Sequence, residues 1–200
     1  MTGRRLRLML FIVVAVIQLS VAAGAIIRSE IALRSGEVYR FKLQPVDPVD
    51  AFRGRYVALR LAETNAPIAE ELPYLHNKKV FVPLIVDDEG FAVFGLAAFE
   101  RPDSGDYLRL RCGIEHTHES GQRLVSLAIP FQRYYMTEEL AKDVDRSLWR
   151  RGQRPAWVTV RVWKGAAVVE DLYVDGRPVR EWLTDGGAES EPPLIPTTDP

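Results

Sequence analysis

The chain has 200 residues, of which 47% are hydrophobic and 26% charged, enough for one folded domain. Its net charge is -1, but four of the 26 basic residues and none of the 27 acidic residues precede residue 29, so residues 29–200 carry a net charge of -5. Because nucleic-acid binding depends on clustered Lys and Arg, this balance argues against a nucleic-acid partner.

Residues 8–27 form a continuous apolar segment, LMLFIVVAVIQLSVAAGAII, whose only clearly polar members are Gln18 and Ser20. A helix of about 20 such residues spans the roughly 30 Å hydrocarbon core of a bilayer. Three arginines lie in residues 1–7 and no charge lies within the segment, which is typical of an N-terminus that stays in the cytoplasm. We therefore predict a signal-anchor that enters the lipid bilayer through residues 8–27, with residues 1–7 cytoplasmic and the rest of the chain outside.

A cleaved signal peptide is the alternative, because residues 21–25, VAAGA, supply the small side chains of a cleavage site. The apolar regions of signal peptides usually span about 7–15 residues, so the longer segment found here favours an uncleaved anchor. The lone cysteine, Cys112, excludes an internal disulfide. A single thiol in a strand is most often a small buried hydrophobic residue.

Past Arg28 the sequence changes to short alternating runs separated by turn residues, a pattern that predicts strands and hairpins. The turns DDEG at 87–90, HESGQ at 118–122 and KG at 164–165 each join two such runs. We predict a mainly β fold of antiparallel strands and hairpins in one domain over residues 31–184. The predicted strands are 36–44, 55–63, 78–86, 90–99, 106–115, 122–129, 156–163 and 167–174.

One α-helix is predicted at 137–152, TEELAKDVDRSLWRRG, and is expected to pack on the sheet. Thr137 can cap this helix, and its apolar side chains recur at helical spacing. A second, short helical turn is expected after Pro178. Residues 185–200 contain too little apolar surface and too much proline and glycine to fold, so we predict a disordered tail there.

The stretch PVDPVDAF at 45–52 is predicted to be a stiff extended bend ahead of a strand. Each proline fixes its own backbone, and Asp47 and Asp50 can accept hydrogen bonds from nearby backbone amides. In residues 56–61, which follow, the apolar side chains alternate towards the core. We count the two aspartates among the candidate binding residues.

Two predicted strands each carry a tyrosine and an arginine four residues apart. Tyr56 and Arg60 in GRYVALRL, and Tyr107 and Arg111 in GDYLRLRC, are predicted on faces away from the core. These four side chains could form a recognition face for a partner. Alternatively, a half-exposed sheet carries such residues without any ligand, and arginine stacks on tyrosine for modest stability.

The sharpest polar cluster is EHTHE at 115–119. In a strand, His116 and His118 share one face and, with Glu115 or Glu119 nearby, could hold a divalent transition metal. The cluster also lies at a predicted hairpin tip, where polar residues are expected without a metal. We therefore assign no metal site and no cofactor, and keep His116, His118 and Glu115 as metal candidates.

The strand WVTVRVW at 157–163 alternates valines with larger side chains. If the valines face the core, Trp157 and Trp163 lie on the opposite face. The predicted helix at 137–152 then covers them, or they form a binding or membrane-contact patch. The net negative charge of the domain disfavours contact with anionic lipid headgroups.

Several motifs follow one another along the chain. After the N-terminal anchor come PVDPVDAFRG at 45–54, GRYVALRL at 54–61, CGIE at 112–115, RYYMTEEL at 133–140 and VDGRPV at 174–179. In their order and spacing these motifs resemble the GDYXXLXY family of uncharacterised bacterial membrane-anchored proteins. Two residues depart from the family motif: Arg55 stands in place of aspartate and Leu61 in place of tyrosine. The resemblance implies a bacterial inner-membrane protein with a periplasmic or extracytoplasmic main domain and a multi-pass membrane protein as partner.

Catalytic signatures are absent from the sequence: it contains no Gly-x-Ser-x-Gly, Ser-x-x-Lys or His-Glu-x-x-His motif and no phosphate-binding loop. We therefore expect an accessory or interaction module for a multi-pass membrane partner rather than an enzyme. The alternative is an envelope hydrolase or metal-dependent enzyme that uses the His116/His118 cluster.

Overall fold

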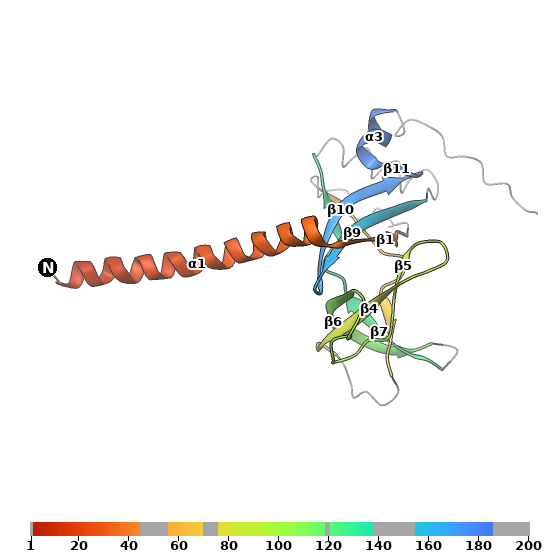
Figure 1. Ribbon diagram of the computed structural model, residues 1–200, viewed down its shortest axis with the longest axis horizontal. Helices are drawn as coiled ribbons and strands as arrows, with labels where there is room; N and C mark the ends of the chain where they lie inside the picture. The colour runs from red at the N-terminus through yellow and green to blue at the C-terminus, as the bar shows by residue number, and fades with distance from the viewer. Residues whose placement is uncertain (1, 45–55, 70–75, 119–120, 138–154, 186–200) are drawn as a thin grey trace, which may run out of the picture.

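The computed structural model describes residues 2–44, 56–69, 76–118, 121–137 and 155–185. Apart from Thr137, the predicted helix at 137–152 lies outside the described residues, as does the predicted tail beyond Asp185. The elements, labelled in Figure 1, are α1 (Thr2–Ser35), β1 (Glu37–Lys42), β2 (Tyr56–Ala58), β3 (Asn65–Pro67), β4 (Lys79–Val86), β5 (Ala92–Phe94), β6 (Tyr107–Thr117), β7 (Arg123–Ala128), β8 (Arg133–Tyr135), β9 (Ala156–Trp163), β10 (Ala166–Val174), β11 (Arg177–Pro178) and α3 (Val179–Thr184).

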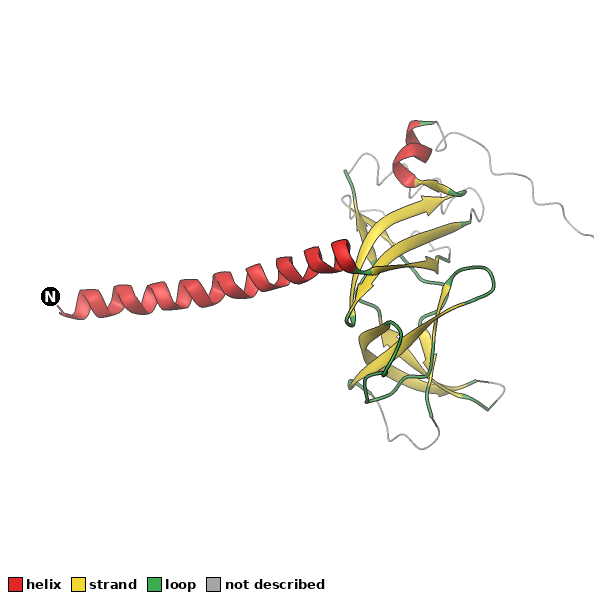
Figure 2. Cartoon of the chain, viewed as in Figure 1, coloured by secondary structure: helices red, strands yellow, loops and turns green. Residues whose placement is uncertain are grey.

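The strands form two larger sheets and one small one (Figure 2). The first sheet contains β1, β9, β10 and β11 in that order, and the second contains β3, β7, β6, β4 and β5 and curves into a half-barrel. β2 and β8 form a separate two-stranded sheet. All these strand pairs are antiparallel, which confirms the predicted mainly β class.

Each of the eight predicted strands overlaps an observed one, although β6 runs two residues past its predicted end and β10 begins one residue early, and the helical turn predicted after Pro178 is α3. Of the predicted strand 55–63, Tyr56–Ala58 pairs with β8, the Leu59 amide donates to the Gln132 carbonyl at 2.9 Å, and Leu61 forms an isolated bridge to Leu43, directly after β1. The alternation pattern does not predict β3, β8 or β11, since strands of two or three residues show too few alternations.

A hydrophobic core is built from the inward faces of both larger sheets. Val158, Val160 and Val162 of β9 are 0%, 0% and 1% exposed, as predicted for the core face of this strand. Leu108 and Leu110 of β6 are buried in the same cluster. Each such side chain removed from water stabilises the fold by roughly 1.5–3 kcal/mol, so the alternating faces supply the main driving force for folding.

α1 is 34 residues long, extends well beyond the predicted 8–27 segment, and meets the domain without a linker. Its last turns, RSEIALRS, continue the helix because they contain good helix formers, and Arg34 pairs with Glu30 one turn earlier at 2.8 Å. Ala32 is fully buried where α1 contacts β9 and β10. Residues 31–35, which we predicted as the start of the β domain, are therefore helix packed on its sheet.

Gly36 makes the close approach between α1 and β9 possible. A Cβ at this position would overlap the carbonyl oxygen of Ala32 and lie 2.9 Å from that of Val162. Arg161 of β9 donates through Nη1 to the Gly36 carbonyl at 3.1 Å, and its Nη2 lies 2.7 Å from a carboxylate oxygen of Glu170 on β10. The helix dipole also favours a cation at this end of α1. Backbone contact, a hydrogen bond and an ion pair together fix the junction.

Replacing Leu108 by alanine is expected to lower the free energy of unfolding by roughly 2–5 kcal/mol, because this fully buried side chain would leave a cavity. The matched control is Leu96→Ala, since Leu96 is 52% exposed and its truncation should cost less than about 0.5 kcal/mol. Chemical denaturation of both variants measures the difference. Equal destabilisation by the two substitutions would contradict the described core.

Candidate functional site

The segment that carries GRYVALRL enters the small two-stranded sheet. Residues 45–55, and with them Asp47 and Asp50, lie outside the described residues. From there on, Tyr56 of β2 pairs with Tyr135 of β8 in an antiparallel register. The paired strands come from GRYVALRL and RYYMTEEL, so the fold brings two of the sequence motifs side by side.

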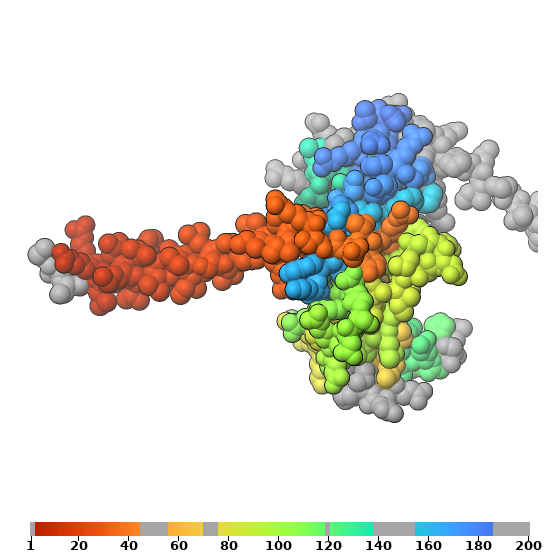
Figure 3. All heavy atoms as spheres, in the orientation of Figure 1, coloured from red at the N-terminus to blue at the C-terminus, as the bar shows by residue number. Residues whose placement is uncertain are grey.

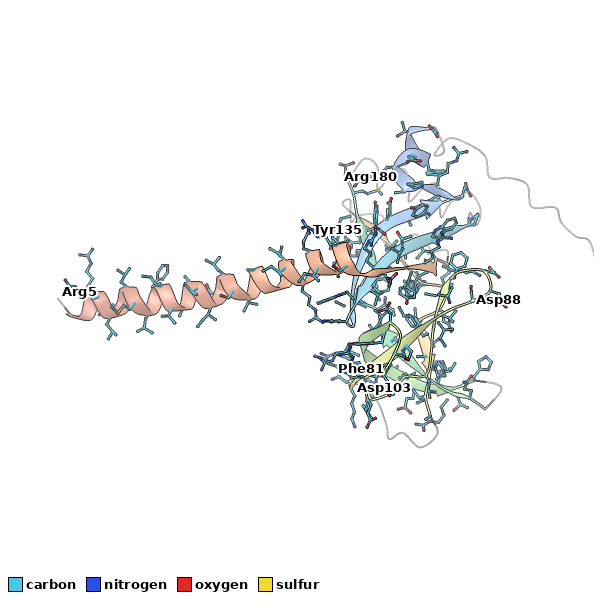
Figure 4. All side chains as sticks on the ribbon, viewed as in Figure 1. Arg5, Phe81, Asp88, Asp103, Tyr135 and Arg180 are labelled. Atoms are coloured by element: carbon cyan, nitrogen blue, oxygen red, sulfur yellow. The ribbon has the colours of Figure 1, made fainter. Side chains whose placement is uncertain are left out.

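Tyr56, Arg133 and Tyr135 form a surface group, named here the β2–β8 cluster. The two tyrosine rings meet edge to face with centroids 5.9 Å apart, and the Arg133 guanidinium lies 4.9 Å from the centre of the Tyr56 ring. Tyr135 is 65% exposed, and Figure 4 shows it on the side of the domain from which α1 leaves. Arg60, just beyond β2, is also exposed. Exposed aromatic and arginine side chains are typical of protein-binding surfaces.

Tyr134, between Arg133 and Tyr135 in the chain, turns inward and is 8% exposed. Its hydroxyl donates to Asp171 Oδ1 at 2.8 Å, next to a register shift in β10. Burial raises the pKa of Tyr134, the hydrogen bond to Asp171 and the charge of Asp171 raise it further, and Arg180 acts in the opposite direction. Because side chains alternate along β8, Tyr134 points inward and links this strand to β10, whereas Arg133 and Tyr135 point outward.

Residues 105–107, Gly-Asp-Tyr, make contacts that stabilise the fold. Tyr39 of β1 donates its hydroxyl to Asp106 Oδ2 at 3.1 Å and so links the two larger sheets. Tyr107 is only 6% exposed, because its ring packs edge to face on Phe81 at 5.5 Å between centroids and the β9–β10 turn lies against it. Tyr107 lies on the predicted face away from the core, but it is covered there, so the prediction that it is exposed is wrong.

The two tyrosine–arginine pairs lie in different sheets. Tyr56 and Arg60 belong to the β2 segment, whereas Tyr107 and Arg111 belong to β6 of the five-stranded sheet. Arg111 is exposed as predicted, and its Nη1 donates to Asn77 Oδ1 at 2.8 Å. The repeat in the sequence therefore does not correspond to two paired strands that share one face.

The EHTHE segment lies at the end of β6, where His116 and His118 are exposed. Glu115 alternates to the other face of the strand and pairs with Arg123 of β7 at 2.9 Å. Within the described ranges, no group of three His, Cys, Asp or Glu side chains could hold a metal ion. The described part of EHTHE, residues 115–118, therefore offers two exposed imidazoles and a carboxylate that is already engaged by a cation, while Glu119 lies outside the described residues.

Trp157 and Trp163 lie, as predicted, on the face of β9 opposite the valines. The Trp157 ring stacks on Tyr173 with centroids 5.5 Å apart and planes 5° apart, and Phe91 meets it edge to face. Trp163 lies beside Lys164, whose ammonium is 4.6 Å from the ring centre. Since Tyr173 and Phe91 come from β10 and from the β4–β5 turn, no local signal in the sequence could identify them as the cover of Trp157.

A family model described as GDYXXLXY protein matches residues 18–172, which is most of the chain. The chain belongs to this family. No curated protein and no solved structure matches it. The matched region begins within α1 and ends in β10, so it contains the α1–sheet junction and the β2–β8 cluster.

Two other motifs of this GDYXXLXY family member shape strands. CGIE contains a bulge in β6, where the Ser126 hydroxyl oxygen accepts from the Ile114 amide at 2.8 Å. Burial raises the pKa of the Cys112 thiol in the same motif, which disfavours a reactive thiolate. VDGRPV contains the tight β10–β11 turn, in which Asp175 and Gly176 both have positive φ. The β2–β8 cluster differs from these motifs because it leaves aromatic side chains on the surface.

The link between Tyr39 and Asp106 is expected to make stability fall steeply at high pH. Burial, then the charge of Asp106 and the hydrogen bond to it, raise the pKa of Tyr39 to about 12. An unfolded tyrosine loses its proton near pH 10, so the stabilisation is fully present below about pH 10 and is lost as the pH rises through about 12. The melting temperature of Tyr39→Phe should therefore fall less over this interval than that of the wild type.

Tyr135→Phe is the matched control for this measurement, because the same hydroxyl is removed from a side chain that is 65% exposed. Its melting temperature should follow the wild-type curve. Parallel curves for the wild type and Tyr39→Phe would show that the proposed link has no part in the pH dependence.

Proposed function

We propose that this protein is a single-pass accessory module of the bacterial inner membrane, with α1 in the bilayer and the β domain on the periplasmic or extracytoplasmic side. In this proposal it binds a multi-pass membrane protein rather than catalysing a reaction. The observation that carries the proposal is the position of α1. No part of its most apolar window is buried inside the protein, and the same helix continues into the folded domain.

The apolar side chains of α1 call for an apolar environment. Phe11 and Leu19 are each 70% exposed, and the most apolar window of the helix has a mean hydropathy of 2.7. Transfer of such side chains from water to hydrocarbon is favourable, and α1 is long enough to span a bilayer. An uncleaved anchor is also consistent with the burial of Ala32, because the last turns of α1 are part of the folded unit.

The β2–β8 cluster is the proposed contact with the partner. It faces the side from which α1 leaves the domain, which is the direction in which a membrane protein would lie (Figure 4). Buried Tyr, Trp and Arg side chains dominate the binding energy of protein interfaces. Arg60 beside this cluster, and Asp47 and Asp50 in the preceding segment, extend the proposed binding set, while Arg111 belongs to a separate face.

The alternative role, a hydrolase or metal-dependent enzyme at His116 and His118, receives less support from the described contacts. Glu115 is paired with Arg123 and lies on the other strand face, so it does not join the two imidazoles. Stoichiometric metal in the purified full-length protein, lost in the double variant His116→Ala with His118→Ala, would favour this alternative.

The double substitution Tyr56→Ala with Tyr135→Ala is expected to remove the partner while α1 stays in the membrane. The full-length protein is crosslinked briefly in cells and purified in mild detergent, and its companions are identified by mass spectrometry. We expect a stoichiometric multi-pass membrane protein with the wild type and at least a ~10-fold lower yield with the variant, since aromatic hot spots often contribute about 2 kcal/mol each.

Ile85→Ala with Ile114→Ala is the matched control, because these apolar side chains are 54% and 70% exposed in the five-stranded sheet. Equal loss of the partner in this control, or recovery of no multi-pass protein with the wild type, would contradict the binding role. The intact mass of the mature chain tests the anchor separately. A chain that begins near residues 25–29 would mean that α1 is cleaved.

A further inference from the structure

The outward face of β4 and β6 in the five-stranded sheet is basic. Lys79 lies directly opposite Arg111, and Phe81 lies opposite Arg109, in the antiparallel register. Val80, which lies between Lys79 and Phe81 in β4, is fully buried. Because side chains alternate along a strand, Lys79 and Phe81 point outward. Like charges placed directly opposite each other destabilise a sheet. The arrangement of Lys79 and Arg111 therefore weakens the fold, which points to a role outside it.

The β9–β10 turn extends this basic surface. Gly165 has a φ of +81°, and a Cβ there would lie 2.8 Å from the Tyr107 ring and 3.3 Å from Arg109 Cβ, so the turn is in close contact with β6. Lys164 precedes this glycine in the same turn. The Arg101 guanidinium lies 5.2 Å from the centre of the Tyr107 ring. We name five residues the basic face: Lys79, Arg101, Arg109, Arg111 and Lys164.

The basic face carries more positive than negative charge. In the part of the chain that the structure describes, none of its five side chains takes part in an ion pair. The adjoining loop contributes the carboxylates of Glu100, Asp103 and Asp106, and Tyr39 engages the last of these. The charge of this face is therefore opposite in sign to the net charge of -5 over residues 29–200.

The basic face and α1 lie towards the same end of the molecule. Figure 4 shows Phe81, the centre of this face, on the side of the domain from which α1 leaves. In Figure 3 the β9–β10 turn, in light blue, lies at the level of the end of α1, and both of its strands contact the helix. A membrane around α1 would therefore face these side chains.

The length of α1 beyond its apolar segment sets the distance to that membrane. From Arg28 to Ser35 the helix rises about 12 Å, at about 1.5 Å per residue. The lipid headgroup layer is about 5–8 Å thick on each side of the hydrocarbon core, and attraction between charges extends roughly 8 Å further at physiological salt. The junction at Gly36 and Arg161 thus holds the basic face within reach of lipid phosphates.

We propose that the basic face binds anionic phospholipid headgroups of the membrane that contains α1. This inference rests on the anchor proposed above and adds a second, electrostatic contact to it. Lysine and arginine donate charge-assisted hydrogen bonds to phosphate, and the rings beside them suit the interface between membrane and water. The negative net charge of the domain would argue against lipid contact if its charges were evenly spread. In this fold, however, basic side chains are concentrated on one face. Headgroup binding would orient the domain on the bilayer.

The test uses the full-length protein reconstituted in phosphatidylcholine vesicles with and without phosphatidylglycerol. The vesicles that contain phosphatidylglycerol carry a trace of phosphatidylglycerol with a photoreactive headgroup, and the others carry photoreactive phosphatidylcholine. Crosslinked peptides are quantified by mass spectrometry. The phosphatidylglycerol probe should label residues 78–83, 101–111 and 163–165 at least ~10-fold more than the phosphatidylcholine probe. Lys79→Gln with Arg109→Gln should reduce this labelling about 10-fold, to the level of the phosphatidylcholine probe, since each basic residue near an anionic surface contributes roughly fivefold in affinity.

Arg40→Gln with Arg177→Gln is the matched control, because it removes the same charge from exposed residues of the four-stranded sheet. Labelling should stay at the wild-type level in this control. Equal labelling by the two probes, or equal loss in both double variants, would overturn headgroup binding while leaving the anchor intact. Flotation with phosphatidylcholine vesicles tests the anchor itself. A protein that fails to float with them would overturn the anchor, and headgroup binding with it.

Discussion

The contact between the end of α1 and β9 is the constraint on which the rest of the structure depends. Gly36 leaves no side chain between the last turn of α1 and the Val162 backbone, and Arg161 closes the junction by binding the Gly36 carbonyl and Glu170. A flexible linker would let a domain tumble above a bilayer. This junction instead transmits the direction of the helix to the sheet, so each face of the domain keeps a defined position relative to α1.

The remainder of the domain is tied to that junction by a few contacts between sheets. The Tyr39–Asp106 hydrogen bond joins β1 to the start of β6, the Gly165 carbonyl accepts from the Arg109 amide at 3.2 Å, and Tyr134 ties β8 to β10. Each link places a buried or half-buried polar group where it has a partner, which a core of this kind requires. Much of the Gly-Asp-Tyr stretch and the CGIE motif can be understood as parts of this framework rather than as a site.

Two surfaces remain that the framework does not explain. The β2–β8 cluster exposes aromatic rings beside arginines, and the basic face places like charges opposite each other on neighbouring strands. Both lie towards the end of the domain at which α1 leaves (Figure 4). A partner protein at one surface and lipid headgroups at the other are compatible, because the two surfaces belong to different sheets and a rigid α1 would present both to the same membrane.

The sequence by itself determined the apolar helix, the β class, the position of eight strands and the inward faces of β6 and β9, because these follow from local composition and from the period of two along a strand. Only the tertiary structure decided that Tyr107 is buried, that Tyr56 meets Tyr135, that α1 runs unbroken into the sheet, and that basic side chains collect on one face of an acidic domain. These features depend on the register and packing of segments far apart in the chain. The local periodicity of apolar residues does not predict which distant strand will pack against a given side chain.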